Sequence, residues 1–207
     1  MNPRLDDWLS AQPVSRLRSK RKALKFLLEA YSVCVGDMAN KPRADVISQS
    51  GGYAFHVGSP LPDLRQVSSW MMSHAPSQRR LAKMIPALWK RHGREDISIA
   101  GLLMANVSPD DLGQNPWMAF IHLLQRKEAL ATVLEVGEEL VRAGHEVPDD
   151  EWMRAASAQS PQWHQYTVLF VSLRKNQSLS CRDIIVNAPK GGELFERIRH
   201  RLLESEH

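Results

Sequence analysis

Apolar residues recur at helical spacing along most of this chain. Residues 14–35 place Leu17, Leu24, Leu28 and Tyr31 at intervals of 7, 4 and 3, with charged residues between them. This spacing is typical of an amphipathic helix with one buried stripe. The period-two alternation of strands occurs only, and weakly, in residues 52–58, "GYAFHVG". The pattern therefore predicts an all-α protein.

Gly, Pro and Ser divide the chain into about ten such segments, because these residues favour the ends of helices. Helices are predicted over residues 3–11, 14–35, 62–75, 77–92, 96–107, 117–144 (two helices, divided at 125–127), 148–159, 160–176, 181–188 and 192–205. Pro86 lies inside one of them and predicts a kink or a split there. Residues 37–60 are rich in Gly, Ser and Pro and predict a long loop.

One stretch shows how closely successive helices are joined. In "LWKRHGREDISIAGLLMANV", residues 88–107, an apolar helix stops at His92-Gly93 and another starts at once. Gly93 is predicted at the C-cap, and Glu95 and Asp96 at the positive N-terminus of the next helix. Short-linked pairs of this kind predict one domain over residues 1–207, a HEAT-like α-solenoid of stacked helical pairs. No strict repeat period is visible, so a plain helical bundle is the alternative.

The composition is that of an ordinary globular protein, and it argues against a membrane-spanning, secreted or zinc-binding protein. The 207 residues are 43% hydrophobic and 24% charged. No apolar run approaches the roughly 20 residues that cross a bilayer, and the N-terminus lacks the apolar core of a signal peptide. Two cysteines, Cys34 and Cys181, have no metal-ligand spacing. We expect a cytoplasmic protein with no membrane partner, metal or cofactor.

Charge is segregated along the chain, although the net charge is only +4. Residues 64–94 hold seven basic residues and no acid, and residues 16–25 hold six basic residues and no acid. Residues 108–151 hold ten acids against three basic residues. This distribution favours one basic face, which would attract a polyanion by releasing its counterions. A solvated surface that is merely uneven is the alternative.

Two stretches resemble the DNA alkylation repair family, the HEAT-like alkylpurine DNA glycosylases. The first is "LPDLRQVSSWM" followed by "ALWKRHGREDISIAGLLMANV", with a Pro-x-x-Arg start at Pro62 and Arg65 and a Leu-Trp at Leu88-Trp89. The second is "SPQWHQYTVLFVSLRK", a Ser-x-x-Trp start that leads into an apolar helix. Together they cover about a third of the chain. The resemblance implies a HEAT-like fold, DNA as partner and excision of alkylated bases.

The chain departs from this family where the family's chemistry is carried. A Trp followed four residues later by an Asp is expected; here Trp117 is followed by Ile121 and His122. Cleavage of a glycosidic bond develops positive charge on the sugar, and a nearby carboxylate stabilises it. After Trp163 the family has arginines that bind phosphates, where this chain has His164, Gln165 and Tyr166. These substitutions argue against glycosylase activity of the family type.

The candidate site residues follow from charge and from this resemblance. Phosphate contacts are predicted at helix ends and turns, from Arg65, Arg79, Arg80, Lys83, Arg91 and Arg94. Cleft aromatics that could stack on a base or sugar are Trp89, Trp117 and Trp163, and cleft polar residues are His122 and His164. For each of the tryptophans and for His122 the alternative is a place in the core. The acidic run from His145 to Glu151 could hold a cation, or form a solvated loop and a helix cap.

The leading hypothesis is a DNA-binding helical-repeat protein, either an atypical repair glycosylase or a non-catalytic binder. The rival hypothesis is a protein-interaction scaffold that holds a peptide or an acidic partner in its groove. A small-molecule enzyme that uses residues 37–60 as a lid is a third class, for which the sequence offers no catalytic constellation.

Overall fold

The structure is a computed structural model that describes residues 2–35, 52–124, 128–174 and 181–204. All its regular secondary structure is helical, and one isolated bridge joins Phe55 to Gly93. The prediction of an all-α protein is confirmed. The helices of residues 2–124 are α1 (Pro3–Ser10), the 3₁₀ turn η1 (Val14–Leu17), α2 (Lys20–Val35), α4 (Leu61–His74), α5 (Gln78–Ala82), α6 (Ile85–Arg91), α7 (Arg94–Asn106), α8 (Pro109–Leu112) and α9 (Pro116–Leu123). Those of the remaining residues are α10 (Leu130–Arg142), α11 (Asp150–Ser157), α12 (Pro161–Ser172), α13 (Arg182–Val186) and α14 (Glu193–Glu204).

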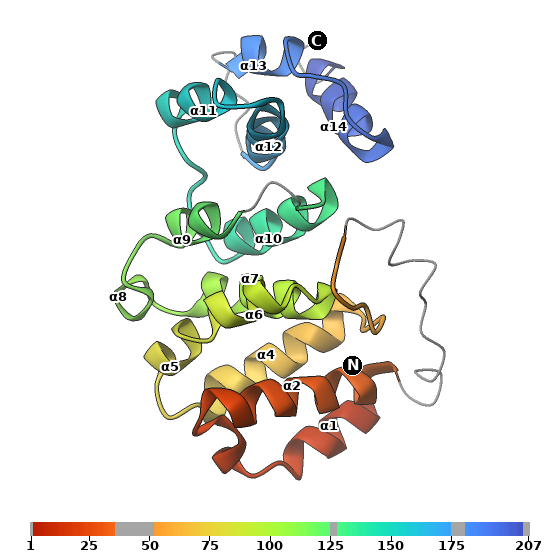
Figure 1. Ribbon diagram of the computed structural model, residues 1–207, viewed down its shortest axis with the longest axis vertical. Helices are drawn as coiled ribbons and strands as arrows, with labels where there is room; N and C mark the ends of the chain where they lie inside the picture. The colour runs from red at the N-terminus through yellow and green to blue at the C-terminus, as the bar shows by residue number, and fades with distance from the viewer. Residues whose placement is uncertain (1, 36–51, 125–127, 175–180, 205–207) are drawn as a thin grey trace. The chain divides into compact units, whose positions relative to one another are not determined.

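These helices group into two compact units, residues 1–124 and 125–207 (Figure 1). We call them unit 1 and unit 2 and describe each by itself. The assignment of residues 1–207 to a single domain stays a prediction.

Unit 1 is built around α7. Every residue of α7 from Glu95 to Ala105 is buried, because α4, α5, α6 and α9 all pack against this helix. A helix that is apolar on all sides must be enclosed on all sides, and "ISIAGLLMA" meets that condition. The layers α1, α2, α4 and the α6–α7 pair follow one another through this unit (Figure 1).

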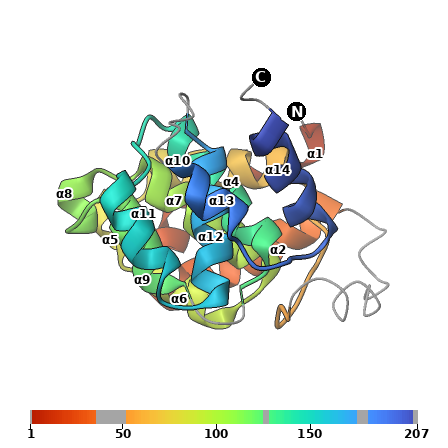
Figure 2. The ribbon, with the colours of Figure 1, turned by 90° about the horizontal axis from the view of Figure 1, so that it is seen from above.

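Unit 2 is built in the same way around α12. Residues 166–171, "YTVLFV", are buried in succession, and α10, α11, α13 and α14 pack against the helix. Figures 1 and 2 both show α12 between α11 and α14. Ser160 starts α12 by accepting a hydrogen bond from the backbone N–H of Trp163 at 3.2 Å, which satisfies one of the first-turn donors.

Most predicted helix limits agree with the structure. Pro86 divides residues 77–92 into α5 and α6, as predicted, because a proline has no N–H for the helix and its ring clashes with the preceding turn. Residues 117–144 form two helices, α9 and α10. The predicted helix over 14–35 begins instead with η1, and α2 starts only at Lys20.

The α6–α7 turn differs from its prediction in one respect. His92, not Gly93, takes the left-handed C-cap conformation, with φ 57°. Gly93 is the extended N-cap of α7, with φ −74° and ψ 145°. A glycine is favoured there for space, since an added Cβ would lie only 2.1 Å from Cζ of Phe55. The prediction that this turn depends on Gly93 is therefore right, but the glycine is needed for space and not for a left-handed conformation.

The ring of Phe55 belongs to an extended segment, residues 52–60, that caps both helices of this hairpin. Ala54 N–H donates to the carbonyl of His92 at 2.8 Å, at the end of α6. The carbonyl of Phe55 accepts from the N–H of Arg94 at 3.0 Å, at the start of α7. Helix ends leave such groups without partners inside the helix, and this segment supplies them. Of the predicted loop at 37–60, residues 37–51 lie outside the described residues.

Replacing Gly93 with Ala tests this account of the turn. We expect the free energy of unfolding to fall by about 1–3 kcal/mol, because the methyl group displaces the Phe55 ring. In the F55A background the same change should cost clearly less, and urea denaturation of the four proteins of this double-mutant cycle measures the difference. The matched control is Gly192→Ala, where an added Cβ meets nothing within 4 Å. Equal costs of G93A with and without the Phe55 ring would contradict this explanation.

Candidate functional site

A group of exposed cations in unit 1 comes from two distant parts of the sequence. The guanidinium of Arg80 on α5 donates to the backbone carbonyl of Arg18, between η1 and α2. This contact, together with the packing of α4 on both η1 and α5, places the start of α2 beside α5. We call this surface the basic ridge, and its residues, all exposed, are Arg18, Lys20, Arg21, Lys22, Arg79, Arg80 and Lys83.

The local sequence explains why these cations face outward. The apolar residues of α5, Leu81 and Ala82, are buried, so the polar positions of this short helix point to solvent. The first turn of α2 likewise buries only Ala23 among residues 20–23. Among the described residues, no ridge cation lies within 4 Å of a carboxylate oxygen. The ridge therefore presents its charge to solvent.

Unit 1 as a whole is also cationic. It holds 16 Lys and Arg against 10 Asp and Glu, whereas unit 2 holds 11 against 13. Three of the acids of unit 1, Asp63, Glu95 and Asp96, are buried. The surface of unit 1 therefore carries fewer acidic residues than the count from its sequence suggests.

The structure separates the six cations that the sequence proposed as phosphate contacts. Arg79, Arg80 and Lys83 belong to the basic ridge. Arg65 is half-buried near the start of α4, about 14 Å along the helix axis from its C-terminal end at about 1.5 Å per residue. Its side chain therefore lies apart from the ridge.

Arg91 is the clearest correction, because its guanidinium is engaged inside unit 1. Its Nε lies 2.7 Å from a carboxylate oxygen of Asp96, and its Nη2 donates to the other oxygen at 3.1 Å. The guanidinium also lies 5.7 Å from the centre of the Phe55 ring. Arg94, the first residue of α7, is half-buried. The sequence predicted phosphate contacts for both arginines and did not predict the ion pair of Arg91 with Asp96.

Glu95 holds residues 52–60 against α7 through its carboxylate. Its Oε1 accepts from three successive backbone N–H groups, those of Val57 at 3.0 Å, Gly58 at 2.7 Å and Ser59 at 3.2 Å. The imidazole of His56 lies 3.9 Å from the same oxygen. Hydrogen bonds to a charged group contribute more than neutral ones, about 1.5–3 kcal/mol each. The sequence predicts this carboxylate at the helix dipole, but no local pattern in it reveals the three N–H groups that Glu95 accepts from.

Asp96 joins α7 to α2. It is fully buried and accepts from the hydroxyl of Tyr31 at 2.9 Å, in addition to its ion pair with Arg91. Burial raises the pKa of Asp96 to about 6, against the opposing effects of Arg91 and of the Tyr31 hydroxyl. Burial also raises the pKa of Tyr31 well above its usual value, with Asp96 as the next cause. This cluster is a buried structural centre rather than an open site.

Two of the three proposed cleft tryptophans lie in the core. Trp89 and Trp117 are each 1% exposed, and both pack on Phe120, at ring-centroid distances of 5.8 and 6.0 Å. Neither ring presents a face to a ligand, so their stacking role is corrected to packing. Trp163 is half-buried in unit 2, edge-on to Trp152 at 6.1 Å and to Tyr166 at 5.5 Å.

The two proposed cleft histidines lie in different units and have different surroundings. His122 is exposed on the last turn of α9, and its Nδ1 lies 3.0 Å from the side-chain oxygen of Gln114. The core alternative for His122 is therefore wrong. His164 is half-buried on α12, and its Nε2 lies 2.7 Å from the backbone carbonyl of Ile184. Because a carbonyl only accepts, this nitrogen carries the proton.

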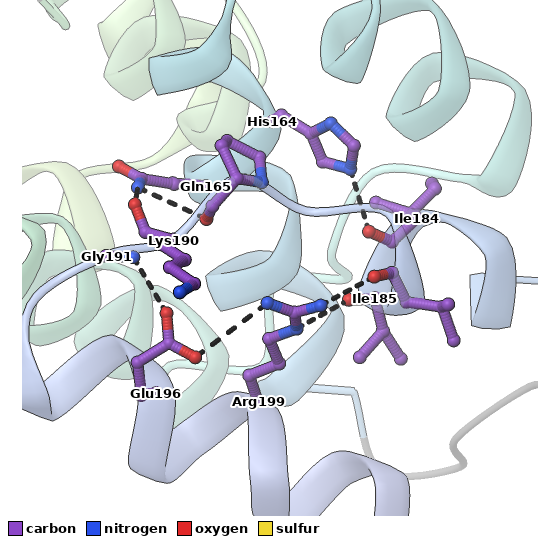
Figure 3. A network of polar contacts seen from close by, with 10 residues as sticks. His164, Gln165, Ile184, Ile185, Lys190, Gly191, Glu196 and Arg199 are labelled. Atoms are coloured by element: carbon purple, nitrogen blue, oxygen red, sulfur yellow. Dashed lines mark hydrogen bonds and ion pairs between the residues drawn. The ribbon is translucent and has the colours of Figure 1, made fainter.

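His164 belongs to a network that ties α13 and its following loop to α12 and α14 (Figure 3). Gln165 donates to the carbonyl of Lys190 at 2.8 Å, and Arg199 donates through Nε to the carbonyl of Ile185 at 3.0 Å. Glu196 accepts from the N–H of Gly191 at 2.8 Å. Arg199 thus satisfies carbonyls at the C-terminal end of α13, where a cation is favoured. These contacts give His164 a structural role.

The acidic run of unit 2 borders a cavity of about 800 Å³ between α10 and α11. Two of its carboxylates already have partners: Asp149 caps α11 through the N–H of Trp152 at 2.8 Å, and Asp150 pairs with Arg174. Within the described ranges no group of three or more potential ligands could hold a metal ion. The helix-cap alternative is therefore confirmed for Asp149.

Neither cysteine has the features of a nucleophile. Burial raises the pKa of Cys34 to about 12, so its thiol stays protonated at neutral pH. Cys181 is fully buried, with its sulfur 3.3 Å from a carboxylate oxygen of Asp150. Both are free thiols.

Comparisons with protein-family models, curated proteins and solved structures give no match for this chain. In the part of the chain that the structure describes, no helix is both long and apolar enough to span a membrane.

The raised pKa of Asp96 generates a prediction for stability against pH. A carboxyl whose folded pKa lies above its unfolded value stabilises the fold most when protonated, and this contribution is lost as pH rises through about 6. We expect the difference in unfolding free energy, wild type minus D96N, to fall by on the order of 2–3 kcal/mol between acid and neutral pH. Urea denaturation of both proteins across this range measures it. A difference that is constant with pH, or that grows toward neutral pH, would contradict the assignment.

Proposed function

We propose that this protein binds DNA through the basic ridge of unit 1 and does so without cleaving it. The observation that carries the proposal is the contact between Arg80 and the backbone of Arg18, which joins two basic stretches of sequence into one exposed surface. Seven cations there have no neighbouring carboxylate among the described residues. Phosphate contacts of this kind position a protein on DNA independently of sequence.

Two features of the described residues support the non-catalytic form of the proposal. Ile121 stands where the resemblance to DNA alkylation repair glycosylases would need a carboxylate, and the two buried carboxylates of α7 are enclosed by protein. The HEAT-like arrangement is part of the same proposal. Its support is the pairing of consecutive helices, α6 with α7 and α11 with α12.

A protein-interaction scaffold is the alternative function, and the basic ridge would then meet an acidic partner. Charge favours DNA over this alternative, because the exposed large hydrophobic residues among the described ones are few and lie apart in sequence: Val14, Leu28 and Val186. Protein interfaces need an apolar centre inside their polar rim.

Removing three cations of the ridge tests the proposal. We expect the wild-type protein to bind a labelled DNA duplex at low salt, with an affinity that falls steeply as salt rises. The variant R79Q/R80Q/K83Q should bind more weakly, and the slope of log K against log salt should decrease by about 2–3, because each phosphate contact contributes about 0.9. Fluorescence anisotropy over a salt series measures both quantities.

The matched control removes three exposed cations from unit 2 in the variant K190Q/R197Q/R201Q. Both variants lose the same net charge, so a loss confined to the ridge variant identifies a surface rather than a total charge. No binding by the wild type at about 50 mM salt, or equal losses in the two variants, would refute the proposal.

A further inference from the structure

Four aromatic rings form a stacked column across three helices of unit 1. Trp8 of α1 stacks on Phe26 of α2 with centroids 5.4 Å apart, and Phe26 stacks on Trp70 of α4 at 4.9 Å. Trp70 in turn stacks on His74, at 4.5 Å with an interplanar angle of 16°. Phe26 is fully buried, Trp8 and Trp70 are half-buried, and His74 is exposed. The column therefore ends at the surface in a flat ring.

The imidazole of His74 is held in this orientation. Its Nδ1 lies 2.8 Å from the backbone carbonyl of Trp70, which fixes the rotation of the ring. One face of the imidazole stacks on the Trp70 ring. Because the His74 side chain is exposed, its other face is open to solvent. Among the described residues, no hydrogen-bond partner contacts its Nε2. A fixed ring with an open face and an open polar edge is suited to a planar ligand.

The place of His74 in the fold connects this ring with the basic ridge. His74 is the last residue of α4, and Arg79 and Arg80 follow five and six residues later on α5. α4 packs against η1, which leads into Arg18 and the start of α2, and against α5, so it contacts elements next to both parts of the ridge. The C-terminal end of α4, at His74, is therefore the end that leads into α5 (Figure 1), where Arg79 and Arg80 of the ridge lie.

We propose that His74, supported by Trp70, is a stacking platform for an unpaired nucleobase whose phosphates lie on the basic ridge. The inference rests on the proposed function and names its ligand more closely, as single-stranded or locally unpaired nucleic acid. A base inside a duplex stacks on its neighbours and offers no free face, whereas an unpaired base can stack on an aromatic ring whatever its sequence.

The alternative role of His74 is electrostatic, because a cation at the last turn of a helix is favoured by the helix dipole. Two substitutions of His74 separate stacking from electrostatics. H74F keeps a flat ring without a charge, and H74K keeps a charge without a ring. All variants change an exposed side chain, and circular dichroism with urea denaturation checks that their folds are equal.

The experiment measures the binding of a labelled oligothymidylate of about 15 nucleotides and of a duplex of the same length. We expect H74A to weaken binding of the single strand about tenfold, H74F to restore it, H74K not to restore it, and the duplex affinity to stay unchanged. The intrinsic tryptophan fluorescence of the protein should change on binding of the single strand to the wild type, through Trp70, and less so in H74A.

The remaining outcomes overturn the inference in distinguishable ways. If R79Q/R80Q/K83Q weakens duplex binding while H74A leaves oligothymidylate affinity unchanged, the platform is refuted and the ridge stands. Equal losses of single strand and duplex in H74A, or rescue by H74K alone, identify an electrostatic role and refute stacking. If the wild type binds neither nucleic acid, both proposals fall.

Discussion

The carboxylate of Glu95 is the constraint on which the arrangement of unit 1 depends. One oxygen accepts from three backbone N–H groups of residues 57–59, and this holds an extended segment across the α6–α7 hairpin. That segment then caps both helices and inserts the Phe55 ring over Gly93. A buried carboxylate without such partners would be strongly destabilising, so the helix pair and the segment are stable only together.

The same hairpin determines which cations remain for a ligand. Asp96, the neighbour of Glu95, is buried and draws the guanidinium of Arg91 to it, so this arginine contributes little positive charge to the surface. The cations of α5 and of the start of α2 have no such buried partner among the described residues. Local acids, rather than the density of basic residues in the sequence, decide where the positive surface lies.

This distinction explains how much could be predicted from sequence. Helices, the split at Pro86 and the division of residues 117–144 follow from local patterns, and the structure has them. The contacts of Arg91 with Leu24 and of Arg80 with Arg18 join residues 67 and 62 positions apart and have no local signature. The positions of Trp89 and Trp117, in the core or in a cleft, cannot be predicted for a similar reason. An aromatic residue on a helix has the same spacing in the sequence whether it packs inside or faces a groove.

Burial of acids also raises the effective positive charge of the unit 1 surface. Of the acids of unit 1, Asp63, Glu95 and Asp96 lie inside, and only Asp96 is matched there by an arginine within 4 Å that is itself half-buried. Exposed cations can contact phosphates directly, whereas an enclosed carboxylate cannot approach a ligand at the surface. Because counterion release scales with the cations that reach phosphates, the ridge rather than the net charge of +4 sets the expected affinity for a polyanion.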